Sequence, residues 1–250
     1  MSVTPESAVG VSGGRSSAAR NVAIISDGNG RWASSRGVTI GDGHDAAADT
    51  ALARLRDAIA LGIEELTIYT FSTENWSRPD AEVRGLMALL ARRIGNESPR
   101  LHGEGVRICF IGRREGLVAE LLGEMLRAEE LTAANRRITM YVAVNYGGRA
   151  EIVDAAKRFT GSTEEEFRAL LYAPEMHDPD LIIRTGGERR VSNYLLWQCA
   201  YAELVFREEL WPDFSREAFE QSLAEFAARQ RRFGGRSDQR STAAPIDPGG

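Results

Sequence analysis

Short apolar segments alternate with amphipathic ones along most of this chain, and that alternation constrains its fold more than any other feature. Apolar or β-branched runs occupy residues 22–25, 66–71, 106–111, 138–144 and 181–183. Between them, apolar side chains recur at helical spacing from Asp45 to Gly62, after Pro79, over 117–131 and over 150–159. Strands that alternate with helices build right-handed βαβ units and a parallel sheet. The sequence therefore predicts an α/β fold with a central, mostly parallel sheet flanked by helices.

The two ends of the chain lack this pattern. Residues 1–20 and 237–250 are rich in small and polar side chains and carry little that could pack. We predict disordered tails there and one folded domain over residues 21–236, because nothing between them reads as a linker or an internal repeat. A length of 250 residues suits a single domain of this class.

Charge and hydropathy exclude several partners. A net charge of −5 argues against a protein that holds nucleic acid by bulk positive charge. No run approaches the ~18–20 apolar residues of a membrane span, and the first residues lack the apolar core of a signal peptide. Cys109 and Cys199 stand alone, without metal-ligand spacing. We predict a cytoplasmic protein without nucleic-acid partner or membrane span.

Ligands of such sheets bind at the carboxyl ends of the strands, so the residues after each strand carry most information. The first apolar run leads into residues 26–32, Ser-Asp-Gly-Asn-Gly-Arg-Trp. Glycines let backbone N–H groups point at an anion, Asp27 offers a hard oxygen for Mg²⁺, and Arg31 can clamp a phosphate. A plain Asp-Gly/Asn-Gly turn is the competing interpretation, and the two stand about even.

Two later loops have a similar character. Residues 71–79 crowd hydroxyls, an amide, a Trp and an Arg between a strand and a helix, although Ser72 or Thr73 could simply cap that helix. Residues 184–194 place two glycines between arginines and then a serine, which favours a phosphate nest. A solvated charge run is the alternative, but core sequence flanks the segment on both sides.

Two further side chains stand out. Glu203 lies in the apolar stretch 200–206 and would need an Arg or a metal as partner when buried. His44 sits where a helix could begin, a position where a cap is more common than a catalyst. Anion-binding loops, carboxylates and an apolar interior, without a nucleophile–base triad, indicate a diphosphate ester with an apolar tail that is handled with Mg²⁺.

The chain resembles the cis-prenyltransferases, the undecaprenyl diphosphate synthase family, over residues 21–236. The resemblance rests on six motifs in the family's order, at residues 27–33, 71–79, 145–149, 184–188, 192–198 and 211–214. It implies a homodimeric α/β catalytic domain with an apolar substrate tunnel. It also implies Mg²⁺-dependent transfer of an allylic prenyl group onto a second isoprenoid diphosphate, usually isopentenyl diphosphate.

The resemblance also assigns roles to single residues. Asp27 matches the aspartate associated with metal and diphosphate, and Glu203 matches a carboxylate that helps to hold Mg²⁺. The residues that match binders of the allylic diphosphate are Gly28, Asn29, Gly30, Arg31, Trp32 and Arg78. Those that match binders of the second diphosphate are Arg184, Arg190 and Ser192. Those that match residues near the reacting carbons are Ser72, Asn75, Trp76 and His44. Arg232 and Gly234 match a C-terminal pair that reaches a diphosphate in the partner subunit.

The segment before His44 departs from the family. Ile40 stands where an Arg for the allylic diphosphate is usual, and Asp42 adds a negative charge nearby. We expect Asp42 to repel that diphosphate or to recruit a further Mg²⁺, and the donor to be no longer than a farnesyl group. Thr70, at a tunnel-wall position where long-chain members often have Ala, also favours a short product.

Several functions remain in competition. The leading one is regular condensation to a short chain. An alternative is head-to-middle coupling of two short allylic diphosphates to a branched, lavandulyl-type product. A non-catalytic family subunit is disfavoured because Asp27, Arg31 and Asn75 are all present, and a nucleotide enzyme is disfavoured because no Gly-x-x-x-x-Gly-Lys-Ser/Thr motif occurs. Peripheral membrane contact is expected only for a long product.

Overall fold

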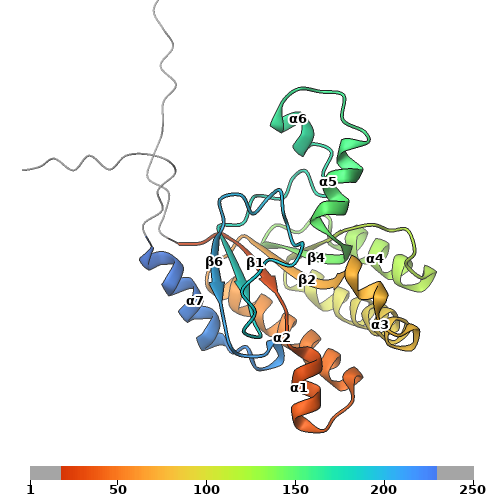
Figure 1. Cartoon of the computed structure of the whole chain (residues 1–250), viewed down its shortest axis with the longest axis vertical. Coiled ribbons are helices and arrows are strands. Elements are labelled where there is room, and N and C mark those ends of the chain that lie inside the picture. Colours follow the sequence, from red (N-terminus) through yellow and green to blue (C-terminus); the bar gives the residue numbers. More distant parts are fainter. Residues whose placement is uncertain (1–17, 230–250) are drawn as a thin grey trace, which may run out of the picture.

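A six-stranded parallel sheet runs through the part of the chain that the computed structural model describes, residues 18–229 (Figure 1). The strands are β1 Asn21–Ile25, β2 Glu65–Ser72, β3 Val106–Ile111, β4 Ile138–Tyr146, β5 Leu181–Arg184 and β6 Glu203–Phe206. Their order across the sheet is β3-β4-β2-β1-β5-β6, and every neighbouring pair is parallel. The predicted fold class is confirmed.

Helices cover one face of this sheet, whereas the largely irregular segment around residues 172–199 packs on the other (Figure 1). The helices are α1 Asn29–Arg36, α2 Ile40–Ala60, α3 Asp80–Gly103, α4 Ala119–Thr132, α5 Gly148–Ala156, α6 Glu164–Arg168 and α7 Arg216–Ala228, with short 3-10 helices η1 Thr73–Ser77 and η2 Trp211–Asp213. The sequence pattern did not predict β6, α6 or α7. It also began α2 at Asp45, whereas the helix starts at Ile40 because Thr39 caps it.

The strands send alternate side chains into two cores. Ile24, Leu66 and Ile68 belong to the larger core, whereas Ala23 and Tyr69 belong to the core on the opposite face. Alternation of this kind is what a sheet covered on both faces requires.

The folded region starts slightly before the predicted boundary. Ala19 is buried, and the backbone N–H of Arg20 donates to Asp180 Oδ2 at 2.9 Å. Residues 18–20 therefore pack against the domain because they extend the approach to β1, and assigning them to a disordered tail was wrong. The other residues of both predicted tails lie outside the described residues. Within residues 18–229, no helix is long and apolar enough to cross a membrane.

Candidate active site

The loop after β1 forms one wall of a polar cavity at the carboxyl edge of the sheet. Gly28 has φ 111°, and a Cβ there would lie 2.8 Å from the Leu210 side chain, so only glycine fits without a shift. Asn29 then begins α1, whose first backbone N–H groups have no partner within the helix. A glycine turn that leads into a helix start is a suitable cradle for an anion.

Arg184 joins this loop to the loop after β5. Its side chain is only 5% exposed, and its Nη2 donates to Asp27 Oδ2 at 2.9 Å. Its Nη1 donates to Ser192 Oγ at 2.6 Å and to the Arg190 carbonyl. The contact with Asp27 follows from the register, because Ile25 of β1 pairs with Arg184 of β5. The structure thus brings Asp27, Arg184 and Ser192 together with the Arg190 carbonyl, whereas the exposed Arg190 guanidinium pairs with Glu188.

Asn193 ties the same loop to the loop after β2. Its Nδ2 donates to Glu74 Oε1 at 2.7 Å, and its Oδ1 accepts from the Arg149 N–H at 2.9 Å. Its backbone is left-handed, with φ 61°. Sequence reasoning missed both Asn193 and Glu74. The available signal was the tolerance of Asn for left-handed backbone beside a predicted nest.

Ser72 and Asn75 close the turn that begins η1. The Ser72 N–H donates to Asn75 Oδ1 at 2.9 Å, and the two residues form a capping box. Trp76 packs edge-on against Phe71 and donates its indole N–H to Asn145 Oδ1 at 2.7 Å. These side chains shape the loop, and their predicted part near the reacting carbons stays a prediction.

The polar cavity has a volume of about 300 Å³. Besides residues 26–31 it is lined by Ile40 and His44 of α2 and by Arg78 and Glu82 at the start of α3. Burial, and secondly the charge of Arg78, lowers the pKa of His44, which is therefore neutral at pH 7. Its Nε2 is buried without a hydrogen-bond partner among the described residues.

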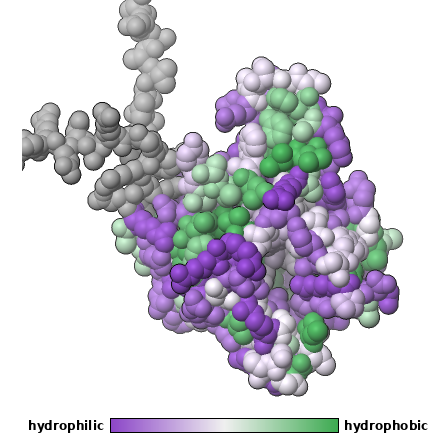
Figure 2. All heavy atoms as spheres, in the orientation of Figure 1, coloured by the Kyte–Doolittle hydropathy of each residue, from purple (hydrophilic) through white to green (hydrophobic). Residues whose placement is uncertain are grey.

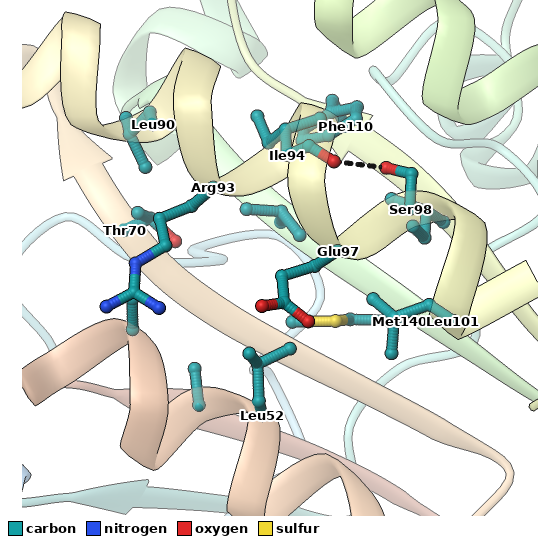
Figure 3. Close-up of a pocket in the computed structure, with 14 residues that line it drawn as sticks. Leu52, Thr70, Leu90, Arg93, Ile94, Glu97, Ser98, Leu101, Phe110 and Met140 are labelled. Carbon is teal, nitrogen blue, oxygen red and sulfur yellow. Dashed lines mark hydrogen bonds between the residues drawn. The ribbon is translucent and has the colours of Figure 1, made fainter. Parts of the chain in front are cut away.

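An apolar channel continues from this cavity beneath α2 and α3. The polar cavity shares Ser26, Asn29 and His44 with a second space of about 70 Å³. That space shares lining residues, among them Thr70, Leu90 and Arg93, with a third of about 110 Å³, whose walls come from α2, α3 and strands β2, β3 and β4 (Figure 3). A ligand with an anionic head and an apolar tail would match this sequence of environments.

Trp32 does not contact the polar cavity. Its indole N–H donates to Asp213 Oδ1 at 2.8 Å, and the Arg36 guanidinium lies over its ring at 4.4 Å and also contacts Asp213. The residue faces η2 because it lies one turn beyond the loop, on the outer side of α1. The structure therefore does not support its predicted contact with substrate and gives it a role in fixing α1.

Glu203 is not near Asp27 within one chain. It pairs with Leu181 at the start of β5, whereas Arg184, the partner of Asp27, lies at the other end of that strand. Its carboxylate accepts from Arg229 Nη1 at 2.8 Å. The two carboxylates therefore do not meet within one chain, and the predicted part of Glu203 in holding Mg²⁺ stays a prediction. Arg232 and Gly234 lie outside the described residues.

Asp42 is a capping residue. Its carboxylate accepts from the Thr39 backbone N–H at 2.9 Å and from the Thr39 hydroxyl at 2.7 Å. It does not line the polar cavity, although Ile40 does. The side chain is directed to the helix start and not into the cavity, and its predicted effect on a diphosphate or on Mg²⁺ stays a prediction.

Asp27 can supply one oxygen ligand to Mg²⁺. Proteins commonly hold this ion with one or two carboxylates and the phosphates of the substrate. No group of three or more His, Cys, Asp or Glu that could bind a metal occurs within residues 18–229. The residues present fit an ion that arrives with a diphosphate better than a metal bound by protein ligands alone.

Comparison with known proteins agrees with this geometry. Residues 25–234 match the family model described as putative undecaprenyl diphosphate synthase. The chain is 48% identical to isoprenyl transferase 2 of Bradyrhizobium diazoefficiens, over 88% of this chain and 92% of that protein. It is 44% identical to a trans,polycis-polyprenyl diphosphate synthase of Thermobifida fusca, specific for (2Z,6E)-farnesyl diphosphate, over 86% of this chain and 80% of that protein.

Two crystal structures are also similar. Lavandulyl diphosphate synthase from Lavandula x intermedia, in complex with dimethylallyl diphosphate, superposes with a TM-score of 0.84 at 33% identity, covering 88% of this chain and 99% of that one. A probable undecaprenyl diphosphate synthase from Campylobacter jejuni gives 0.75 at 31% identity, covering 87% and 99%.

Proposed function

The chain belongs to the undecaprenyl diphosphate synthase family, the cis-prenyltransferases, and we propose that it condenses an allylic prenyl diphosphate with isopentenyl diphosphate to a short product. The reaction class follows from the family: it is an isoprenyl transferase of the cis-prenyl diphosphate synthase type. The donor, the product length and the residues that act are the proposal.

The observation that carries the proposal is the continuity of the polar cavity with the apolar channel. Residues 27–31 and Arg78 would hold the allylic diphosphate, while its prenyl tail enters the channel past His44. Arg184, Arg190 and Ser192 would hold the second diphosphate. Because Arg184 contacts Asp27 directly, the two diphosphates would bind next to each other. Such alignment can supply much of the rate enhancement in a two-substrate reaction.

Isoprenyl transferases generally use Mg²⁺, and Asp27 is the residue that we propose to hold it. When bound, the ion would stabilise negative charge that develops on the departing diphosphate. Arg31 and the N–H groups at the start of α1 would stabilise the same charge with fixed donors. Ser72, Asn75 and Trp76 would shape the wall near the reacting carbons.

The size of the channel supports a short product. Its two apolar spaces measure about 70 and 110 Å³, whereas a cavity of ~150 Å³ accommodates a benzene-sized molecule. Spaces of this size leave little room for a long polyprenyl chain. Thr70 lines the same channel from the sheet side.

We further propose a homodimer with shared sites. β6 is an edge strand of the sheet, and Figure 2 shows apolar surface beside it. Tyr201, just before β6, is 74% exposed. An edge with apolar surface invites pairing with another chain. Glu203, Arg232 and Gly234 would then contribute to the site of the partner subunit.

Head-to-middle coupling of two allylic diphosphates is the second candidate. Ile40 lines the polar cavity at the position where the family usually has an Arg, so the donor diphosphate has one fewer cation. The likeness to lavandulyl diphosphate synthase is consistent with this reaction. The isoprenyl transferases, at higher identity, favour regular condensation.

One set of incubations separates the two reactions. The enzyme is incubated with dimethylallyl, geranyl or farnesyl diphosphate, each with and without isopentenyl diphosphate, and the products are identified by mass spectrometry and NMR. Regular condensation requires isopentenyl diphosphate and gives a linear Z product. A branched product from dimethylallyl diphosphate alone would favour the second reaction, and no product in any mixture would contradict the proposed function.

A further inference from the structure

Thr70 marks a hollow under α2 and α3. It lies on the central strand β2 and on the same face as the buried residues Leu66 and Ile68, yet its side chain is exposed. An exposed residue on a central strand means that nothing packs on the sheet there. Thr70 lines both apolar spaces of the channel, so this hollow is the junction between them.

Arg93 of α3 lies opposite Thr70 at this junction. It also lines both apolar spaces, and Figure 3 shows its side chain passing Thr70 toward α2. The channel-facing positions of α3 include Leu86, Leu90 and Leu101, and two charged residues, Arg93 and Glu97, interrupt this apolar stripe. A charged side chain in such a stripe requires partners that hold its head group outside the apolar space.

Two aspartates of α2 provide those partners. Arg93 Nε donates to Asp45 Oδ1 at 3.0 Å, and Nη1 donates to Asp49 Oδ1 at 2.8 Å. Nη2 donates to the Asp45 carbonyl at 3.2 Å. The two aspartates are four residues apart and so project from one face of α2. The guanidinium is held at several points, and the aliphatic stem remains across the channel.

We propose that Arg93, held by Asp45 and Asp49, is a specificity-determining residue that limits product length by narrowing the junction of the two apolar spaces. This inference rests on the proposed function. A growing prenyl chain that reaches the junction must either stop or displace a side chain that is anchored by several charge-assisted hydrogen bonds. Such bonds are stronger than those between neutral groups, so the side chain acts as a fixed wall.

Arg92 offers a matched control on the same helix. Its Nη2 donates to Asp45 Oδ1 at 3.0 Å, so it shares a partner with Arg93. It is not among the residues that line the apolar spaces of the channel. Arg92→Ala therefore removes a guanidinium and an ion pair between α2 and α3 while leaving the channel wall unchanged.

The test compares wild type, Arg93→Ala, Arg93→Met and Arg92→Ala with geranyl diphosphate and excess isopentenyl diphosphate, with product length read by mass spectrometry. We expect Arg93→Ala to lengthen the main product by at least one isoprene unit and Arg92→Ala to match wild type. Arg93→Met, which keeps a stem but loses the anchors, should lengthen it in the same direction. An Arg93→Ala product of wild-type length would overturn the inference while leaving the proposed function intact.

Binding separates this inference from a failure of the proposed function. Calorimetry with unreactive thiolodiphosphates carrying geranyl, farnesyl and geranylgeranyl chains needs no turnover. Arg93→Ala should bind the longest analogue about ten-fold or more tighter than wild type, because additional apolar carbons become buried. If wild type makes no condensation product, the proposed function fails and the binding series alone tests the role of Arg93. Equal dependence of affinity on analogue chain length in wild type and Arg93→Ala would then count against that role. If Arg93→Ala does not fold by circular dichroism, Arg93→Met decides by the same criteria.

Discussion

Asp27 has two tasks at the scale of a single residue. It is the carboxylate best placed to bind Mg²⁺, and it is also the ionic partner of Arg184, whose side chain is almost completely buried. From the sequence, the first task could be anticipated because Asp27 follows a strand in a glycine-rich loop. The second could not, because the pairing depends on the register between β1 and β5, which brings two distant segments together.

Two substitutions of Asp27 separate these tasks. Asp27→Asn keeps an oxygen for Arg184 and should fold with nearly normal stability while losing turnover. Asp27→Ala should also lower the free energy of unfolding by about 1.5–3 kcal/mol, because a charged group loses a hydrogen bond. Steady-state kinetics at saturating Mg²⁺ and urea denaturation measure both effects. Near-normal turnover of Asp27→Asn would remove Asp27 from the metal site.

At the scale of a secondary-structure element, the start of α2 depends on a charged residue that caps the helix. Asp42 appeared as an extra negative charge near a diphosphate, yet it is the third residue of a helix that Thr39 caps. The sequence Thr-Ile-Gly-Asp is compatible with a capping box, and that local signal outweighs the position in the family's motif. Ile40, in contrast, does line the polar cavity. Its predicted effect on the choice of the allylic substrate stays a prediction.

Removing this cap should affect stability and leave substrate binding unchanged. We expect Asp42→Ala to lower the melting temperature. Its KM for the allylic substrate should equal that of wild type. The hydrogen bond from the Thr39 side chain, followed by that from its backbone, lowers the pKa of the Asp42 carboxyl from its ordinary value. A carboxylate whose pKa is lower in the folded than in the unfolded state stabilises the fold at pH values above its unfolded-state pKa. This stabilisation is lost as the pH falls through the folded-state pKa. The two proteins should therefore converge in stability in strong acid. A raised KM at unchanged stability would support the original expectation.

The loop after β5 is the second element whose shape matters. Ser192, Asn193 and Leu195 have φ values of 46°, 61° and 44°, which non-glycine residues rarely adopt. Contacts of Asn193 with Glu74 and with the start of α5 hold this backbone in place. Glycine-rich composition predicted the nest, but the composition does not show which residue would connect it to the loop after β2.

Asn193 should act as a positioning residue for the second diphosphate. Asn193→Gly keeps the left-handed backbone without strain but removes both side-chain contacts. We expect it to raise KM for isopentenyl diphosphate several-fold more than KM for the allylic substrate. Asn193→Asp keeps the acceptor for the Arg149 N–H but places a carboxylate against Glu74, and it should be the more severe change. Equal effects on both KM values would argue that the loop does not distinguish the two substrates.

At the scale of the whole molecule, the order of most strands and helices could be predicted from the sequence. The side-chain contacts that join segments distant in the sequence could not. β1 to β5 were predicted because each is a compact apolar or β-branched run. β6 was not predicted because it is a short edge strand in which only Val205 is buried, so its sequence shows no clear alternation. The contacts of Trp32, Glu203 and Asn193 could not be read from the sequence because their partners are residues 213, 229 and 74, which no local pattern relates to them.

A shared site makes a prediction about mixed dimers. Asp27→Asn and Arg232→Ala subunits should each be nearly inactive as homodimers. After subunit exchange, one composite site of the mixed dimer regains both groups, so partial activity should return. Light scattering checks the dimer, and differently tagged subunits confirm exchange. Confirmed exchange without recovered activity would indicate that Arg232 serves its own subunit.

We propose that the polar cavity and the small apolar channel together restrict this enzyme to a short prenyl diphosphate product. The most direct measurement is the number of isotopically labelled isopentenyl units in the product formed from geranyl diphosphate with Mg²⁺, counted by mass spectrometry. We expect a product to which very few labelled units have been added before elongation stops. No labelled unit would contradict the condensation, and a ladder of long polyprenyl products would contradict the channel's role in keeping the product short.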